Sequence, residues 1–399
     1  MESDLQPTRR TRPSANELAA EPFRLLFPLG VLAGVIGVSL WPLHFLGLGQ
    51  YPGVPHARLM AHGFFGSFVL GFLGTAMPRM LGASPFRPPL VVALVLLQSG
   101  MVTLHLAGRP WLADLAMLTS LLLLVAALLD RIRRRTDLPP PGFVLAGLGL
   151  ACGVSGLLLG WAPVVDESDA VRAVLQTRLL YQGFLLLPVL GVGGFIFPGL
   201  LGTPNLHEFP EMRWPDRAWL GKAAEAFAVG GVILATFGLE IRGAVSWAYG
   251  IRFGAAAVYL FRQVPLRSPD GRRSTVARSL RAGLVLLLAG LLGAALLPSW
   301  RIALLHLTYA SGLVLVTLAV ATRVLFGHSG QAQRLHARNV WLIVSFALMF
   351  FGTLTRVTGD FLPKILPTHY SYGALMWAGG ALLWAWKTLP AVLVADREG

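Results

Sequence analysis

Apolar runs of about 20 residues recur along the whole chain, and they constrain its fold more than any other feature. Of the 399 residues, 55% are hydrophobic and only 13% are charged, and the mean hydropathy is +0.65. A soluble domain carries roughly twice this share of charged residues, and each run is long enough to cross a bilayer core of about 30 Å. A soluble helical protein is disfavoured because these runs leave no polar faces for water. The sequence predicts an all-α fold, a polytopic membrane bundle of about twelve transmembrane helices over 23–47, 57–80, 89–107, 110–130, 142–163, 173–201, 217–239, 242–262, 280–298, 300–326, 339–359 and 370–395.

Arginine residues gather in alternate connections between the runs, and this pattern predicts the orientation of the bundle. The arginine-rich segments are the N-terminus and the connections after the fourth, eighth and tenth runs: Arg9, Arg10 and Arg12; Arg131, Arg133, Arg134 and Arg135; Arg262, Arg267, Arg272, Arg273 and Arg278; Arg334 and Arg338. The positive-inside rule then places both termini in the cytoplasm. The expected organisation is a cytoplasmic tail over 1–22, one membrane domain over 23–395 and a short cytoplasmic C-terminus over 396–399.

The net charge of +14 follows from this topology. Because the positive charge is dispersed over short loops rather than gathered in a groove, nucleic acid is not expected as a partner. The single cysteine, Cys152, excludes an intramolecular disulfide and an iron–sulfur site built from several thiolates of one chain. No cleavable signal is visible at the N-terminus.

Six of the nine histidines converge on the outer side of the predicted bundle. Imidazole is costly in lipid and is the commonest side chain for holding haem iron or copper, so this convergence predicts a metal cofactor. His62 and His306 are the deepest of the six, and His56 lies at the outer start of the second helix. The other three stand at helix ends, where an imidazole can simply meet water: His44, His105 and His369.

Arginines near the same outer surface add to the case for haem. The two propionates of an outward-facing haem need positive partners, and guanidinium groups suit carboxylates. Arg178 and Arg301 are the candidates, since Arg178 is the deepest and Arg301 lies just before His306 in the same predicted helix. The alternative is internal pairing, as for Arg356 and Asp360, which are spaced i, i+4.

Several segments resemble those of the NnrS family of bacterial membrane proteins. The second-helix stretch HARLMAHGFFGSFVLGFLGTAMPRMLG (56–82) and the tenth-helix stretch HLTYASGLVLVTLAVATRVLFGHSG (306–330) are similar to family signatures. The similarity extends to FRLLFPLGVLAGVIGVSLW (23–41), GGFIFPGLL (193–201) and PAVLVADREG (390–399), so it covers nearly the whole chain.

The second-helix segment departs from the family pattern at two positions. The family usually has tryptophan–histidine–alanine–histidine–glutamate–methionine there, whereas this chain keeps His56 and replaces the second histidine by Arg58 and the acid by Leu59. His62 lies one turn further on. In the middle of the chain, Phe195 stands where the family has an arginine.

The resemblance implies a haem- and copper-containing protein of the bacterial inner membrane that is linked to nitric oxide metabolism and nitrosative stress. We expect axial ligation by His62 and His306, with His56 as the alternate, in a site that leaves a position for nitric oxide or another small diatomic ligand. The sequence predicts neither a catalytic turnover nor an oligomeric state.

Three other functions are compatible with the predicted fold. A haem–copper-oxidase-like reductase is disfavoured, because the tenth helix has only His306 and the sixth and seventh helices have no histidine. A secondary transporter also fits twelve helices, but transporters place their polar residues near the bilayer midplane. An assembly subunit of a respiratory complex is the third alternative.

Overall fold

Every element in the described part of the chain is a helix. A computed structural model describes residues 13–161, 168–203, 211–268 and 274–395. Its α-helices are α1 (Ala15–Ala20), α2 (Phe23–Phe45), α3 (Gly53–Arg58), α4 (Gly66–Met80), α5 (Pro88–Leu106), α6 (Pro110–Arg133), α7 (Phe143–Leu159), α8 (Ser168–Arg178), α9 (Phe184–Leu200), α10 (Arg217–Ile241), α11 (Val245–Gln263), α12 (Thr275–Leu296), α13 (Arg301–His306), α14 (Val314–His328), α15 (Val340–Phe361) and α16 (Leu366–Thr388). Short 3₁₀ turns cover Pro298–Trp300, Ala332–Leu335, Pro363–Ile365 and Leu389–Leu393. The prediction of an all-α fold is confirmed for these residues.

Nine of the described helical segments are long and apolar enough to cross a membrane: Phe23–Phe45, Gly53–Met80, Pro88–Leu106, Pro110–Arg133, Ala170–Leu200, Arg217–Ile241, Thr275–Leu296, Pro298–His328 and Val340–Phe361. The remaining three predicted spans coincide with α7, which is apolar but has only 17 residues, and with α11 and α16, which contain more polar side chains. A multi-pass membrane protein is therefore supported, and the count of twelve spans stays a prediction.

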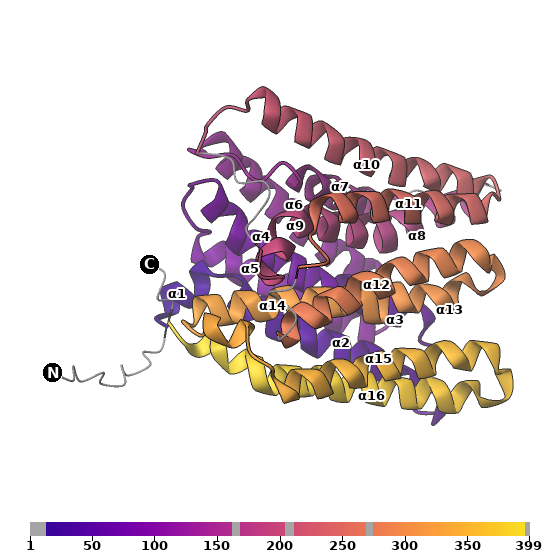
Figure 1. Cartoon of the computed structure of the whole chain (residues 1–399). Coiled ribbons are helices and arrows are strands. Elements are labelled where there is room, and N and C mark those ends of the chain that lie inside the picture. The colour runs from indigo at the N-terminus through magenta and orange to yellow at the C-terminus, as the bar shows by residue number, and fades with distance from the viewer. Residues whose placement is uncertain (1–12, 162–167, 204–210, 269–273, 396–399) are drawn as a thin grey trace.

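The long helices run side by side, and successive helices turn back at opposite ends of the bundle (Figure 1). Helix α1 lies at one end, and the α10–α11, α12–α13 and α15–α16 connections lie at the other. The beginning and the end of the described chain meet at the first of these ends. There the Arg24 guanidinium donates hydrogen bonds of 2.7 Å to the carbonyl oxygens of Val392 and Val394.

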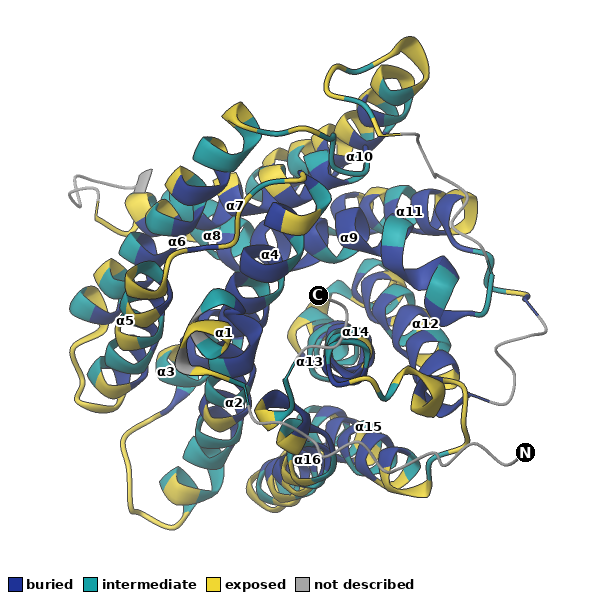
Figure 2. Ribbon diagram, turned by 90° about the vertical axis from the view of Figure 1, so that its left-hand side faces the viewer, coloured by how far each residue is buried: buried dark blue, intermediate teal, exposed yellow. Residues whose placement is uncertain are grey.

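Helix α14 lies in the interior when the bundle is viewed along its helices (Figure 2). It contacts α4, α9, α12 and α16, and the short helix α13, which ends at His306, precedes it along the chain. Large apolar side chains face outward on peripheral helices, including Leu96 of α5, Phe261 of α11 and Leu375 of α16, which are 66%, 68% and 59% exposed. A bilayer is the solvent that such a surface suits.

Glycines allow α7 and α9 to pack closely against each other. A Cβ atom at Gly149 of α7 would lie 2.4 Å from the Pro188 ring, and one at Gly153 would lie 2.8 Å from the Phe184 ring. Only glycine lets α7 approach α9 this closely. Gly149 and Gly153 thus form a small-xxx-small pattern at a helix-packing interface.

Candidate cofactor cavity and buried histidine cluster

A cavity of about 700 Å³ opens between the helices at the end opposite α1, and two of the predicted histidines line it. Its wall is mostly apolar and includes Trp41, Phe65, Leu305 and Trp377. Its polar side chains come from widely separated parts of the sequence and include His56, Arg178, Tyr181, Arg301, His306, Arg356 and Asp360. This volume lies within the range of roughly 300–1,000 Å³ that small-molecule and cofactor sites occupy.

Three π-helical segments form the structural basis of the site. They cover Leu59–Phe65, Leu179–Gly183 and Leu307–Leu313. A π-helical turn inserts an extra residue into an α-helix and is often found at functional sites. Each segment directly follows a helix that ends in a basic residue: α3 at Arg58, α8 at Arg178 and α13 at His306. The three interrupted helices therefore place their irregular turns around the same region.

The two cavity histidines are held in the same way. Nδ1 of His56 lies 2.9 Å from the Gly37 carbonyl oxygen, and Nδ1 of His306 lies 2.7 Å from the Ile302 carbonyl oxygen. A carbonyl oxygen only accepts hydrogen bonds, so Nδ1 of each ring carries the proton and donates it. The neutral ring then presents Nε2 as a lone pair. Histidines that bind a metal are commonly oriented by this kind of backbone hydrogen bond.

The cavity arginines differ in how far the protein already satisfies them. Arg178 donates to Glu240 at 2.6 Å, and Arg356 donates to Asp360 at 2.7 Å and lies 3.7 Å above the Tyr370 ring. The predicted pairing of Arg356 with Asp360 is thus confirmed. Arg301 donates to the Pro298 carbonyl oxygen at 3.2 Å, a partner without charge. Of the two predicted propionate partners, Arg301 is therefore the freer to bind an anionic group.

A buried ionic network supports Arg178 from behind. Glu240 of α10 accepts from Arg178 through Oε2 and from Arg252 of α11 through Oε1, the latter at 2.7 Å. The fully buried Arg252 also donates to Thr236 and to Gln182. This network was not predicted from the sequence. Charged residues inside otherwise apolar helices are its signal.

His62 and His105 lie outside the cavity lining, in a second polar cluster. His62 Nδ1 and His105 Nε2 each lie 3.9 Å from Asp114 Oδ1 of α6. Arg58 forms an ion pair with the other oxygen, with Nη2 at 3.2 Å from Asp114 Oδ2. Neither Asp114 nor its pairing with Arg58 was predicted from the sequence. The position of this aspartate inside an apolar run could have indicated a buried polar cluster.

The remaining predicted ligands, His44 and His369, belong to neither site. His44 stays near the surface, where its Nδ1 lies 3.2 Å from the Gly49 carbonyl oxygen, and His369 packs beside Gly359. Of the three other histidines, His328 contacts Glu21 at 2.9 Å and His336 is exposed. His207 lies outside the described residues. As the structure stands, no three His, Cys, Asp or Glu side chains among the described residues are placed to hold a metal ion.

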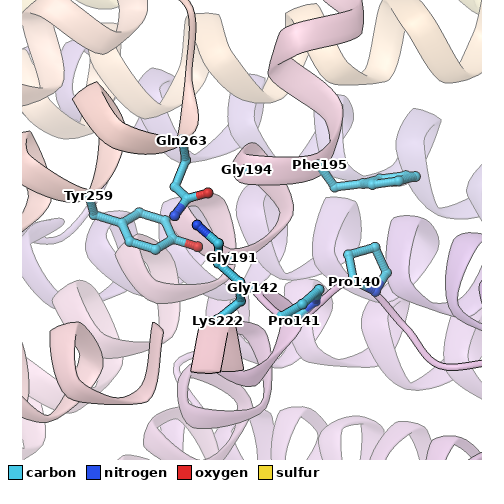
Figure 3. A pocket seen from close by; sticks show the side chains of 9 residues that line it. All are labelled: Pro140, Pro141, Gly142, Gly191, Gly194, Phe195, Lys222, Tyr259 and Gln263. Carbon is cyan, nitrogen blue, oxygen red and sulfur yellow. The ribbon is translucent and has the colours of Figure 1, made fainter. Parts of the chain in front are cut away.

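A much smaller pocket of about 20 Å³ lies between α7, α9, α10 and α11 (Figure 3). Pro140, Gly191, Lys222, Tyr259 and Gln263 are among its lining residues. A buried water needs a volume of roughly 10–15 Å³ of this kind. The pocket therefore has room for about one water molecule and is too small for a cofactor.

Comparison with known proteins supplies the family. The family model described as NnrS protein matches residues 17–396, nearly the whole chain. No curated protein matches the sequence. The match includes all three interrupted helices, the cavity and the buried cluster, and on this basis the chain belongs to the NnrS family.

Proposed function

We propose that this protein binds haem in the cavity lined by His56 and His306 and acts in nitric oxide metabolism or protection against nitrosative stress. Membership of the NnrS family supports a role related to nitric oxide. The observation that carries the haem proposal is the pair of imidazoles on one cavity, each with Nδ1 committed to a backbone carbonyl and Nε2 left for a metal.

The residues present fit a haem group in three respects. The cavity volume and its largely apolar wall suit a flat macrocycle. His306 and His56 supply neutral imidazole nitrogen, the ligand found in many haem proteins. Arg301, Arg178 and Arg356 supply positive charge for the propionates, with Arg301 the least engaged within the protein.

Haem iron, when bound, supplies reversible binding of a small diatomic molecule such as nitric oxide. The chain's own residues orient the ligand nitrogens, balance anionic groups and exclude water. Trp41, Phe65 and Trp377 line the wall and lower the local polarity. His62, which was expected to be an axial ligand, lies in the separate cluster, so we assign His56 and His306 to the cavity.

The proposed setting is the bacterial inner membrane, with twelve spans and with the cavity near the outer surface. The arginine-rich connections would then face the cytoplasm, as the positive-inside rule requires. The apolar surface of the peripheral helices suits a lipid bilayer.

Alanine substitution of each cavity histidine tests the ligand assignment. We expect His306→Ala and His56→Ala to lower the haem content per chain or to shift the Soret band, because each change removes an Nε2 from the cavity. The matched control is His336→Ala, which changes an exposed histidine outside the cavity and should leave both readouts unchanged. Wild-type occupancy and an unshifted band in both cavity variants would overturn the assignment.

A further inference from the structure

The cluster of Arg58, His62, His105 and Asp114 contains an unusual number of buried polar atoms without partners. Both ring nitrogens of His62, both ring nitrogens of His105, Asp114 Oδ1 and Arg58 Nη1 are buried and accept or donate no hydrogen bond within the protein. The His62 and His105 side chains are each 1% exposed. Each buried polar atom of this kind needs a specific explanation, such as an ordered water or an ion.

The three potential ligand groups have the composition of a transition-metal site. Two imidazoles and one carboxylate are a common ligand set for zinc and related ions. Two ligands bound to one such ion at about 2.1 Å lie roughly 3.4 Å apart in tetrahedral geometry. The observed separations of 3.9 Å, both measured to the same Asp114 oxygen, exceed that value by about half an ångström.

A positive charge is already present at the same carboxylate. The Arg58 guanidinium, with only 10% of its side chain exposed, lies 3.2 Å from Asp114 Oδ2. It also lies 5.7 Å from the centre of the ring of Tyr181, a residue that lines the cavity, whereas Arg58 itself does not line it. Arginine keeps its charge at all physiological pH values, so Asp114 is neutralised without a metal ion.

We propose that Arg58 supplies the positive charge that a metal ion would otherwise bring to His62, His105 and Asp114. We propose that this charge keeps transition metals out of the cluster. An incoming metal ion would face a fixed like charge at short range in a poorly solvated interior, where such repulsion is strong. The proposal concerns a site separate from the haem cavity and does not depend on haem binding.

The proposal is tested by measuring zinc bound per chain, with zinc dissociation constants, in the detergent-purified full-length protein. Zinc is distinct from haem iron in elemental analysis. We compare wild type with Arg58→Lys, which keeps a positive charge, and with Arg58→Ala and Arg58→Gln, which remove it. The double variant Arg58→Ala/His62→Ala removes one ligand from the opened cluster.

Wild type and Arg58→Lys should bind no zinc that depends on His62. Arg58→Ala and Arg58→Gln should each gain about one zinc ion per chain, because the repelling charge is removed, and the double variant should lose it. If Arg58→Ala unfolds without metal, recovery of its thermal transition by added zinc supports the proposal, and Arg58→Gln gives the binding measurement.

Two results would overturn the proposal. One is tight zinc binding by wild type that His62→Ala abolishes, because the cation would then not exclude the metal. The other is a folded Arg58→Gln or Arg58→Ala protein that binds no more zinc than wild type. Even if every Arg58 variant is unstable, the measurement on wild type and His62→Ala shows whether the native cluster binds zinc.

Discussion

Glu240 lies between two guanidinium groups in the interior of the bundle, and both share its single negative charge. Its two oxygens accept from Arg178 at 2.6 Å and from Arg252 at 2.7 Å, and its side chain is 2% exposed. Removing one partner of a buried ion pair is costly, because the remaining charge is left uncompensated. Glu240 therefore connects the stability of α10 and α11 to the position of a cavity residue.

At the residue scale, we predict that Glu240→Gln lowers the free energy of unfolding by about 3 kcal/mol. The physical reason is that Arg178 and Arg252 then share no counter-charge. The measurement is thermal unfolding of the purified protein in detergent.

The matched control is Glu225→Gln, which breaks the pair between Glu225 and Arg262 at 3.2 Å. The Arg262 side chain is 62% exposed, so this change should cost less than about 1 kcal/mol. Equal effects of the two substitutions would show that the buried network does not stabilise the bundle as described.

Single residues were predictable where their chemistry is unusual for their position. Histidines in apolar helices revealed His56 and His306 as cavity residues, and the arginines of the same end revealed Arg178 and Arg301. The partition of the six histidines into a cavity pair, a cluster pair and two others was not predictable. It depends on which face of each helix turns inward, and residue depth along the helix does not determine that face.

At the element scale, the three π-helical segments explain why the site forms where it does. Each replaces the regular hydrogen-bonding pattern for a turn and changes the direction of the side chains that follow. The sequence predicted three continuous helices over these ranges, and their extents agree with the structure. The interruptions were not predictable, because one inserted residue barely disturbs the periodicity of an apolar helix.

Close packing of α12 positions the segment that carries His306. A Cβ atom at Gly290 would lie 2.3 Å from Thr308 Oγ1 and 2.6 Å from the Thr308 backbone nitrogen. We predict that Gly290→Ala destabilises the protein by about 1–3 kcal/mol and lowers haem occupancy, because the segment after His306 must move. Thermal unfolding and haem content per chain are the two readouts.

The matched control for this prediction is Gly254→Ala in α11, where an added Cβ would meet no atom within 4 Å. Alanine favours the helix at an unobstructed position, so this variant should be at least as stable as wild type. Identical behaviour of the Gly290 and Gly254 variants would contradict the proposed role of α12.

At the scale of the whole molecule, the arginine distribution predicts which end of the bundle faces the cytoplasm. The native cysteine, Cys152, is 3% exposed, so single cysteines can be introduced without removing it. Arg109 and Arg134 are exposed residues on either side of α6, at its opposite ends. We predict that a membrane-impermeant maleimide labels Arg109→Cys in intact cells and labels Arg134→Cys only after permeabilisation.

The reverse labelling pattern would place the cavity on the cytoplasmic side, and labelling of both variants in intact cells would contradict a long transmembrane α6. The sequence predicted the membrane class and the helix extents because hydropathy depends on composition alone. It overlooked the polar interior of α11, since Arg252 is fully buried and pairs with Glu240 rather than with solvent.

An absorption spectrum of the detergent-purified wild-type protein shows whether the His56–His306 cavity holds haem. The spectrum is recorded oxidised and dithionite-reduced, with iron quantified on the same sample. We predict a Soret band, about one iron per chain, and a band shift on addition of nitric oxide. A folded protein that is colourless and free of iron would show that the cavity does not hold haem.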